Sequence, residues 1–320
     1  MNPPLLEVKG LTKSFPISGS RFREKKYVHA VNGVNLKVSE GETLAIVGES
    51  GCGKSTTGRL LLRLLEPDEG IILYEGKNLM DLGKKEMKEV RKDFQMVFQN
   101  PFDTLNPRHT IKKILSEPLI AHKIEREKRD YLVEEMIERV GLTRESLTRY
   151  PFEFSGGQRQ RIGIARALML KPKLIVADEP VSALDVSIQS QILNLLQDLQ
   201  EQLNLTYIFI SHDLQVVQYI ATNVAVMYFG EVIEYAKKED IFTNPYHPYT
   251  KSLLTSIPKK DPDEQREKII LTGDFPSPSN PPSGCKFHTR CPMAREKCKK
   301  VAPTLLDYEN RKVACHFVAN

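Results

Sequence analysis

The chain has 320 residues, 40% of them hydrophobic, and a net charge of +5. We expect one large domain with a smaller appendage, because a chain of this length and composition can bury a substantial core. The basic residues alternate with acidic ones in stretches such as KKEMKEVRK, which favours solvated helix faces over a nucleic-acid-binding surface.

The sequence carries no sign of a membrane span or an export signal. No apolar run reaches the roughly 18 to 20 residues that a membrane helix needs. The start, MNPPLLEVKG, lacks the charged and then apolar layout of a secretory signal. We therefore expect the chain in the cytoplasm.

The first predicted elements are a strand, a glycine-rich loop and a helix. Residues 43–47 form a short apolar run, which predicts a buried strand. An amphipathic pattern then predicts a helix from Ser55 to about Leu65, with Pro67 and Gly70 ending it. Between Gln99 and Tyr150 the pattern is helical and charged, which predicts an inserted helical subdomain.

The later elements return to strands. KLIVADEP and TYIFISHD are compact apolar runs, and the helical pattern VSIQSQILNLLQDLQEQL between them predicts parallel strands joined by a crossover helix. VAVMYFGEVIEYA predicts two strands around a turn at Gly230. The proline-rich stretch from Phe275 to Gly284 is typical of a linker.

The loop after the first buried strand predicts a phosphate site. Gly48, Gly53, Lys54 and Ser55 fit the pattern G-x-x-x-x-G-K-[ST] between a strand and a helix. Backbone N–H groups of residues 49–55 can point at phosphate oxygens, aided by the positive end of the helix. This cradle comprises Gly48, Glu49, Ser50, Gly51, Cys52, Gly53, Lys54, Ser55 and Thr56.

Three side chains of this loop have predicted roles of their own. We expect Lys54 to reach the β- and γ-phosphates, Ser55 to ligate Mg²⁺, and Thr56 to bond an α-phosphate oxygen. The Cys52 thiol serves only as a small filler, because an amide cradle uses its N–H group. The alternative is a plain glycine turn with an exposed lysine.

LIVADEP supplies a pair of acids at the carboxyl end of an apolar strand, where ligands bind in open α/β sheets. Asp178 suits a first-shell or outer-shell place around Mg²⁺, and Glu179 can orient or deprotonate water for in-line attack on the γ-phosphorus. Paired acids at a strand end are common surface features, so this prediction depends on the phosphate loop.

FSGGQRQRIGIARAL places two glycines behind a serine at the start of a helical pattern. The simple explanation is a helix start, with Ser155 as the cap and Gly156 and Gly157 making a turn. A serine hydroxyl and glycine amides at a helix N-terminus also form an anion-binding end.

The order of the motifs resembles the ATP-binding subunits of ABC transporters, and the resemblance covers residues up to about 250. The motifs, in chain order, are GESGCGKST at 48–56, Gln99 after a strand, FSGGQ at 154–158, LIVADE at 174–179, SALD at 182–185, and His212 after a strand. Phe154 stands where the family usually has leucine, which is a conservative apolar change.

The resemblance implies a site shared between two subunits. Ser155, Gly156, Gly157 and Gln158 are expected to bind the γ-phosphate of an ATP held by the other subunit. Gln99 is expected to contact Mg²⁺ and the attacking water, His212 the γ-phosphate, and the turn from Ser182 to Asp185 the opposing monomer. In isolation a glutamine at a strand end is usually just solvated, and a lone histidine is usually a packing residue.

The adenine-stacking aromatic of the family lies near the N-terminus. Phe15 is the candidate because LTKSF aligns with the family's first strand, and Tyr27 is the second choice. The alternative is that Phe15 belongs to the core.

Three segments, FQNPFDTLNPR, ADEPVSALDVSIQSQILNLL and NPYHPYTKSLLTSIP, look like the oligopeptide and dipeptide importers, specifically their second ATPase subunit. The resemblance implies import of oligopeptides or dipeptides, with a related nickel or other small-solute importer as the alternative. The implied partners are a homologous ATPase subunit, or a second copy in isolation, two membrane permeases, and indirectly an extracellular peptide-binding protein. The implied location is the cytoplasmic face of the membrane.

Four of the five cysteines lie near the C-terminus with the spacing C-x5-C-x6-C-x16-C. Cys285, Cys291, Cys298 and Cys315 suit zinc or a [4Fe–4S] cluster equally by number, but the short knuckles preferred by zinc are absent. The family's C-terminal extension resembles this one and carries a [4Fe–4S] cluster, which we adopt, with Zn²⁺ as the alternative. His288 and His316 are possible substitute ligands, and four unrelated reduced cysteines are the simplest alternative.

We therefore predict an α/β fold, the P-loop NTPase core of an ABC ATPase with an antiparallel β portion, a helical subdomain and a small cysteine-rich extension. The predicted divisions are 1–98 and 166–257 for the two parts of the nucleotide-binding core, 99–165 for the helical subdomain and 258–320 for the extension. The cofactors implied are ATP, Mg²⁺ and the cluster.

Two other classes of protein share some of these motifs. ABC proteins of DNA repair carry a long coiled coil between the glycine loop and the Ser-Gly-Gly segment, and those of translation carry two cassettes; this sequence has neither. A small-molecule kinase could use the same phosphate loop but has no need of FSGGQ or His212.

Overall fold

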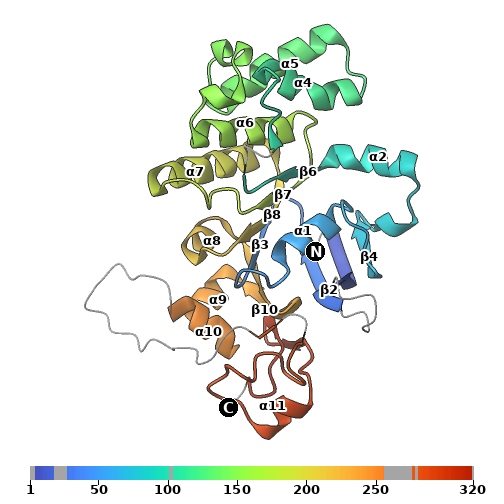
Figure 1. The fold of residues 1–320 in the computed structure, drawn as a ribbon, viewed down its shortest axis with the longest axis vertical. Helices are drawn as coiled ribbons and strands as arrows, with labels where there is room; N and C mark the ends of the chain where they lie inside the picture. Colours follow the sequence, from blue (N-terminus) through green and yellow to red (C-terminus); the bar gives the residue numbers. More distant parts are fainter. Residues whose placement is uncertain (1–3, 18–26, 101–103, 256–275, 278–279, 319–320) are drawn as a thin grey trace. The chain divides into compact units, whose positions relative to one another are not determined.

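The computed structural model describes residues 4–17, 27–100, 104–255, 276–277 and 280–318, and the chain folds into two compact units (Figure 1). The first unit consists of Met1–Ser39, Thr43–Met80 and Ser211–Asn320. The second unit consists of Glu40–Glu42 and Asp81–Ile210. The ATPase motifs are thus distributed over both units.

An antiparallel sheet begins the first unit. Its strand order is β2 (Tyr27–Val38), β1 (Leu6–Pro16), β4 (Glu69–Tyr74) and β5 (Lys77–Asn78). Apolar side chains alternate along β1 and meet buried partners on both neighbours, with Val8 opposite Leu36 of β2 and Ile72 of β4. This alternation buries one face of the sheet, as expected for a strand with a period of two.

The phosphate loop is attached to a second group of strands in the first unit. Here β11 (Leu306–Tyr308), β12 (Arg311–Val313), β10 (Glu231–Lys237), β9 (Asn223–Tyr228) and β3 (Thr43–Val47) lie in that order. All five residues of β3 are buried, and β3 runs parallel to β9. The predictions of a strand at 43–47 and of two strands around Gly230 are both confirmed.

The helix after the phosphate loop, α1 (Lys54–Leu61), is shorter than predicted. The sequence pattern extends it to Leu65, but Arg63 has a left-handed φ of 47° and its Nη1 donates a 2.6 Å hydrogen bond to the Leu79 carbonyl. Helical periodicity cannot predict this contact, because Leu79 lies further along the chain, beyond the strand that follows α1.

Among its described residues, the C-terminal part of the first unit contains the short helices α8 (Leu214–Ile220), α9 (Lys238–Thr243), α10 (Pro248–Thr255) and α11 (Glu296–Lys300). Tyr228 of β9, Tyr249 of α10 and Phe287 of the cysteine-rich segment pack on one another. Their ring centroids lie 4.7 to 5.4 Å apart. The cysteine-rich segment therefore shares the core of the strands that carry the phosphate loop.

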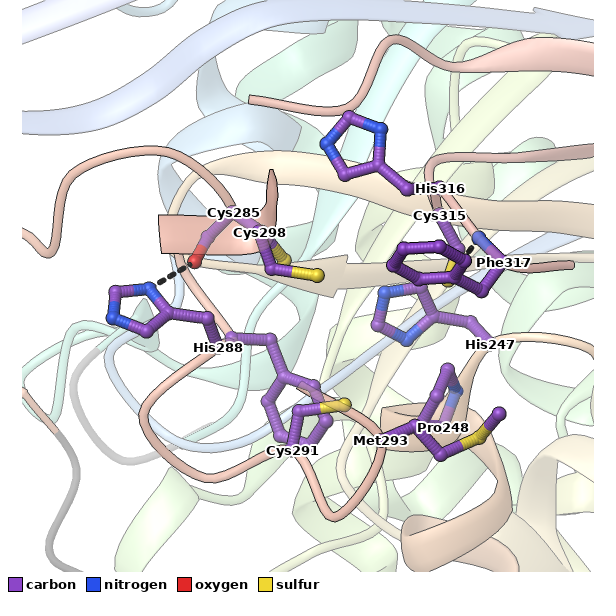
Figure 2. A pocket seen from close by; sticks show the side chains of 11 residues that line it. His247, Pro248, Cys285, His288, Cys291, Met293, Cys298, Cys315, His316 and Phe317 are labelled. Carbon is purple, nitrogen blue, oxygen red and sulfur yellow. Dashed lines mark hydrogen bonds between the residues drawn. The ribbon is translucent and has the colours of Figure 1, made fainter. Parts of the chain in front are cut away.

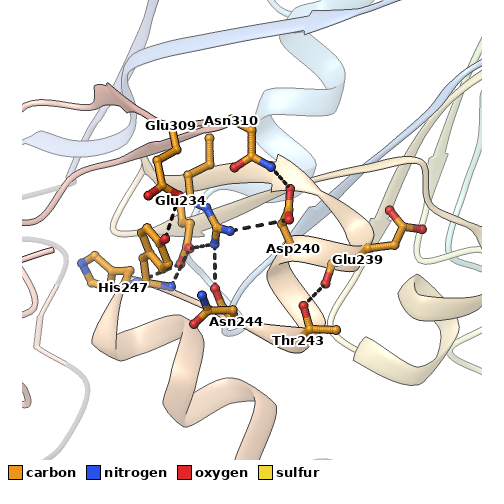
Figure 3. A network of polar contacts seen from close by, with 10 residues as sticks. Glu234, Glu239, Asp240, Thr243, Asn244, His247, Glu309 and Asn310 are labelled. Atoms are coloured by element: carbon orange, nitrogen blue, oxygen red, sulfur yellow. Dashed lines mark hydrogen bonds and ion pairs between the residues drawn. The ribbon is translucent and has the colours of Figure 1, made fainter. Parts of the chain in front are cut away.

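A buried polar network joins β12 to β10 (Figure 3). Glu234 is fully buried and accepts hydrogen bonds from the backbone N–H groups of Tyr246, at 2.8 Å, and His247, at 2.9 Å. Arg311 lies 3.8 Å from the same carboxylate and donates to the Asn244 carbonyl at 2.6 Å. Burial raises the pKa of Glu234, and these donors offset the cost of burying its charge.

The second unit contains three parallel strands in the order β8 (Thr206–Ser211), β7 (Leu174–Asp178) and β6 (Phe94–Val97). The helix α7 (Val186–Leu203) connects β7 to β8, as the crossover prediction requires. The helix α2 (Lys84–Asp93) precedes β6. Both β7 and β8 are buried along their whole length, which explains their continuous apolar sequences.

Helices dominate the stretch between β6 and β7. It contains α4 (Ile111–Ala121), α5 (Arg126–Arg139), α6 (Gly156–Leu168) and two 3-10 turns at Arg144–Thr148 and Pro151–Glu153. Apolar residues of α4 and α5 such as Ile114 and Ile137 are buried. The prediction of helices without a strand between Gln99 and Tyr150 holds for the part of this stretch that the structure describes.

The predicted boundary at 257/258 and part of the predicted proline-rich linker, including Phe275, lie outside the described residues. In the described ranges, none of the helices combines the length and the apolar character required to cross a bilayer.

Candidate functional site

The phosphate loop occupies the turn between β3 and α1 of the first unit. Other segments of the same unit contact its backbone. Gly53 has a φ of 103°, and a Cβ atom there would stand 2.0 Å from the Ala30 carbonyl oxygen. The Gly230 N–H donates to the Cys52 carbonyl at 2.9 Å. The glycine of the motif is therefore required by this close approach, independently of any bound phosphate.

Lys54 reaches across the loop. Its Nζ donates to the carbonyl oxygens of Gly48 at 2.8 Å and Glu49 at 3.0 Å, and the residue is 5% exposed. Ser55 and Thr56 are half-buried in the first turn of α1. The Lys54 ammonium is thus held against the loop by the loop's own carbonyls.

Cys52 and Glu49, two residues of the loop, have different surroundings. Cys52 is buried, and burial raises the pKa of its thiol, which agrees with a filler role. The N–H of Glu49 donates to the Tyr249 hydroxyl at 2.9 Å. In this structure the Glu49 amide therefore bonds to Tyr249 of α10, and the Cys52 N–H donates to the Glu49 carbonyl at 3.3 Å.

The carboxylates of the second unit stand at the end of β7. Asp178 is 6% exposed, and Glu179 follows it with a left-handed φ of 47° while its N–H donates to the Ile210 carbonyl at 2.9 Å. A non-glycine residue in this conformation costs about 1–3 kcal/mol. The turn carries the Glu179 side chain away from the buried strand.

Gln99 meets Glu179 although 80 positions separate them. The Gln99 Nε2 donates to the Glu179 carboxylate at 2.9 Å and lies 3.5 Å from the Ser182 hydroxyl. The Ser182 hydroxyl in turn donates to the Glu179 carbonyl at 3.1 Å. Parallel strands β6 and β7 end at the same edge, so the residues that follow them come together.

The Ser-Gly-Gly segment begins α6. The Ser155 hydroxyl accepts from the Gln158 N–H at 3.3 Å, and the Gln158 side chain accepts from the Ser155 N–H at 3.0 Å. This is a reciprocal capping box, and both side chains are exposed. Phe154, the departure from the family pattern, is buried with the Arg149 guanidinium 4.5 Å from its ring centroid.

Gly157 has a packing role that the sequence did not reveal. A Cβ atom there would stand 2.5 Å from the Cγ2 of Ile188 on α7, whereas one at Gly163 of the same helix would meet nothing within 4 Å. Close packing of α6 on α7 therefore excludes a side chain at Gly157, whether or not phosphate binds there.

This difference predicts opposite effects on stability. Gly157→Ala is expected to destabilise the chain by about 1–3 kcal/mol through overpacking. Gly163→Ala, the matched control, is expected to stabilise it by about 0.5–1 kcal/mol, since alanine favours a helix interior. Urea unfolding measures both, and equal stabilisation by the two substitutions would contradict the packing role.

The remaining predicted residues lie on exposed positions. Asp185 is the exposed N-cap residue of α7 and its side chain makes no capping bond. His212 is exposed directly after β8. Phe15 is 38% exposed and Tyr27 is 46% exposed at the paired ends of β1 and β2, which excludes the alternative of Phe15 as a core residue.

The four C-terminal cysteines line one small cavity (Figure 2). Burial raises the pKa of Cys285 to about 11 and also raises the pKa of Cys291 and of Cys315, so these thiols are protonated at neutral pH when nothing binds them. All five cysteines of the chain are free thiols. Among the described residues, no three His, Cys, Asp or Glu side chains converge closely enough to hold one metal ion.

Histidines surround the same cavity. His288 Nδ1 lies 2.8 Å from the Cys285 carbonyl, and His316 Nε2 lies 2.9 Å from the Val301 carbonyl. His247, which the sequence analysis did not single out, is buried at the cavity wall, and its Nδ1 accepts from the Tyr249 N–H at 3.0 Å. Burial lowers the pKa of His247 to about 3, so the ring is neutral.

Comparisons with known proteins identify the family of this chain. Residues 31–182 match the family described as ABC transporter. The chain is 52% identical to the oligopeptide transport ATP-binding protein AppF of Bacillus subtilis, over 98% of this chain and 97% of that protein. The chain belongs to the ABC transporter family. The prediction of this family is confirmed, and with it the prediction of an ATPase.

Further comparisons cover the C-terminal region and the full length of this ABC ATPase. Residues 233–298 match the family described as oligopeptide/dipeptide transporter, C-terminal region. The dipeptide transport ATP-binding protein DppF of Escherichia coli is 48% identical, over 99% of this chain and 96% of that protein. The C-terminal match includes three of the four clustered cysteines.

Solved structures confirm the predicted fold class of this ABC ATPase. CbiO1 of Clostridium perfringens superimposes with a TM-score of 0.66 at 28% identity, over 76% of this chain and 92% of that chain. The ATP-binding cassette MJ0796, in a dimeric structure bound to ADP and Pi, gives a TM-score of 0.64 at 31% identity, over 73% of this chain and 98% of that chain.

Three residues of this ABC ATPase that contact the predicted site were not predicted from the sequence. Tyr249 and Arg290 both contact Glu49, and Ile188 limits the residue at Gly157. Each is distant along the chain from the residue it contacts. The aromatic segment NPYHPYT was the available signal for Tyr249.

Proposed function

We propose that this chain is the ATP-hydrolysing subunit that powers import of oligopeptides or dipeptides through a membrane ABC transporter. The observation that carries the proposal is similarity along the full length to ATP-binding proteins named for oligopeptide and dipeptide transport. The match of residues 233–298 supports it, because this region lies beyond the residues matched by the general ABC transporter family.

In the proposed reaction, the loop from Gly48 to Thr56 binds the phosphates, and Lys54 contacts the β- and γ-phosphates. Ser55, Asp178 and Gln99 would hold Mg²⁺ directly or through its outer contacts, and bound Mg²⁺ would supply positive charge against the developing charge on the phosphates. Glu179 orients the attacking water and accepts its proton. The 2.9 Å hydrogen bond between Gln99 and Glu179 supports this assignment, because it fixes the carboxylate.

The proposed site is completed by a second ATPase subunit. The exposed Ser155 hydroxyl and the N-terminus of α6 contact the γ-phosphate of the ATP held by that subunit, with Gly156, Gly157 and Gln158 beside it. His212 contacts the γ-phosphate, Asp185 the opposing subunit, and Phe15 the adenine. The dimeric state named for MJ0796 supports a paired arrangement.

ATP favours the closed pair because each nucleotide bridges two surfaces, and loss of the γ-phosphate removes the bridge. The proposed partners are a homologous ATPase subunit, two membrane permeases and, indirectly, an extracellular peptide-binding protein, with the chain on the cytoplasmic face of the membrane. The proposed divisions at 98, 165 and 257 separate the core, helical and C-terminal parts.

We also propose that Cys285, Cys291, Cys298 and Cys315 hold a [4Fe–4S] cluster. The chemistry of the donor set supports this proposal: a [4Fe–4S] cluster is held by four Cys thiolates, and these four cysteines line one cavity. The short C-x2–4-C spacing that zinc sites prefer is absent from this segment. When bound, such a cluster cross-links the short C-terminal segment.

The cluster proposal predicts the metal content of the purified chain. Anaerobic purification is expected to give a brown protein with about four iron atoms per chain. Cys298→Ser is expected to lower the iron content, while Cys52→Ser, a matched change of a buried cysteine outside the cavity, leaves it unchanged. Stoichiometric zinc in a colourless protein would contradict the proposal.

Uptake measurements test the transport proposal. Cells lacking this chain are expected to lose uptake of labelled dipeptides or oligopeptides and to regain it when the wild-type chain is supplied. A Lys54→Ala chain should not restore uptake. Unchanged peptide uptake with loss of nickel uptake would instead support the alternative substrate.

A further inference from the structure

The cysteine-rich segment contacts the phosphate loop. Nη1 of Arg290 lies 2.9 Å and 3.2 Å from the two carboxylate oxygens of Glu49. The Arg290 side chain is 11% exposed and the Glu49 side chain 27% exposed, so water only partly screens this ion pair. Glu49 is the residue directly after the first glycine of the loop.

Arg290 is itself rigidly placed. It lies in the turn between Cys285 and Cys291, and its N–H donates to the Phe287 carbonyl at 3.0 Å. Phe287 is 2% exposed and packs against Tyr228 and Tyr249, each with a centroid distance of 5.4 Å. The guanidinium is therefore presented to Glu49 by a turn that is anchored in the core.

Glu49 is held a second time through its backbone. Its N–H donates to the hydroxyl of Tyr249, which belongs to the same aromatic group as Phe287. Side chain and main chain of one loop residue are thus both fixed by residues that follow the ATPase motifs in the sequence. A loop held in this way loses less conformational freedom when a ligand binds.

The pair also has an electrostatic consequence. Glu49 carries a negative charge within a loop whose ligand is a polyphosphate, and like charges at close range repel. The Arg290 guanidinium, which contacts both carboxylate oxygens of Glu49, neutralises that charge. Without it, the carboxylate opposes binding of the phosphates.

We propose that Arg290 is a positioning residue for ATP binding, which holds and neutralises Glu49 and so links the cysteine-rich C-terminal segment to the phosphate loop. The proposal rests on ATP binding at Gly48–Thr56. Arg290 acts on the nucleotide only through Glu49, so its removal should weaken binding and leave the chemical step intact.

The test compares the affinity of purified variants of the full chain for a fluorescent methylanthraniloyl-ATP with Mg²⁺. Arg290→Ala is expected to raise the Kd and the KM for ATP about 5- to 10-fold with kcat within twofold of wild type. Arg290→Lys, which keeps the charge, should recover at least half of the lost affinity on a logarithmic scale.

Lys286→Ala is the matched control. Lys286 belongs to the same turn and pairs with Glu231 at 2.8 Å with similar burial, but this pair does not include the phosphate loop. Its removal is expected to change the Kd by less than twofold while lowering the melting temperature about as much as Arg290→Ala. Equal Kd values for the two variants would overturn the proposal.

A double variant tests the neutralisation directly. Adding Glu49→Gln to Arg290→Ala removes the unpaired charge, so the Kd should fall to within about threefold of that of Glu49→Gln alone. Failure of this rescue would also overturn the proposal. A wild-type chain that binds no nucleotide would instead refute the ATPase function, so the two failures are distinguishable.

Discussion

Glu179→Gln is expected to leave ATP binding intact, to lower the hydrolysis rate at least 100-fold and to trap ATP-bound chains as a closed dimer. Glutamine has the shape of glutamate but cannot accept a proton from water, and a positioned general base contributes about 10²–10⁴-fold to a rate. The phosphate loop belongs to a different segment and remains unchanged. Phosphate release measures the rate, and size-exclusion chromatography with ATP measures the dimer.

Glu201→Gln is a suitable control, because Glu201 is exposed at the far end of α7 and carries the same substitution. It should hydrolyse ATP at the wild-type rate. Wild-type turnover in Glu179→Gln would refute the proposed role of Glu179. A strictly monomeric ATP-loaded variant, unable to join any other ATPase chain, would refute the shared site.

Ser155→Arg is expected to abolish most hydrolysis at the site of the partner subunit while leaving the site of its own chain active. In the proposed shared site the N-terminus of α6 contacts a nucleotide held by the partner, and an arginine side chain there would fill the space of the phosphate. The Ser155 side chain is exposed, so the substitution creates no clash within its own helix.

A mixed complex separates the two sites. Lys54→Ala in this chain silences its own phosphate loop, so the remaining hydrolysis reports the partner's site. Adding Ser155→Arg to that chain should remove the remainder, whereas adding Glu201→Arg, a charge change on an exposed position of α7, should not. Retained activity with Ser155→Arg would show that this segment does not serve the partner.

Local patterns predicted much of the fold. The five apolar residues of β3, the crossover helix α7 and the strands on both sides of Gly230 were identified because each is encoded by the periodicity or the turn chemistry of a short segment. The end of α1 was missed, since Arg63 is bonded to Leu79 rather than to its own helix. Residue roles in catalysis came from motif order and await the experiments above.

The phosphate loop and the helix cap at Ser155 can be read from the sequence because each depends on residues within a few positions of one another, and the order of such motifs along the chain indicates the family. What holds the phosphate loop is visible only in the folded structure. Tyr249 and Arg290 are 200 and 241 positions from Glu49, and Gln99 is 80 positions from Glu179. Such contacts form when packing of the core brings distant segments together, and no local spacing encodes them.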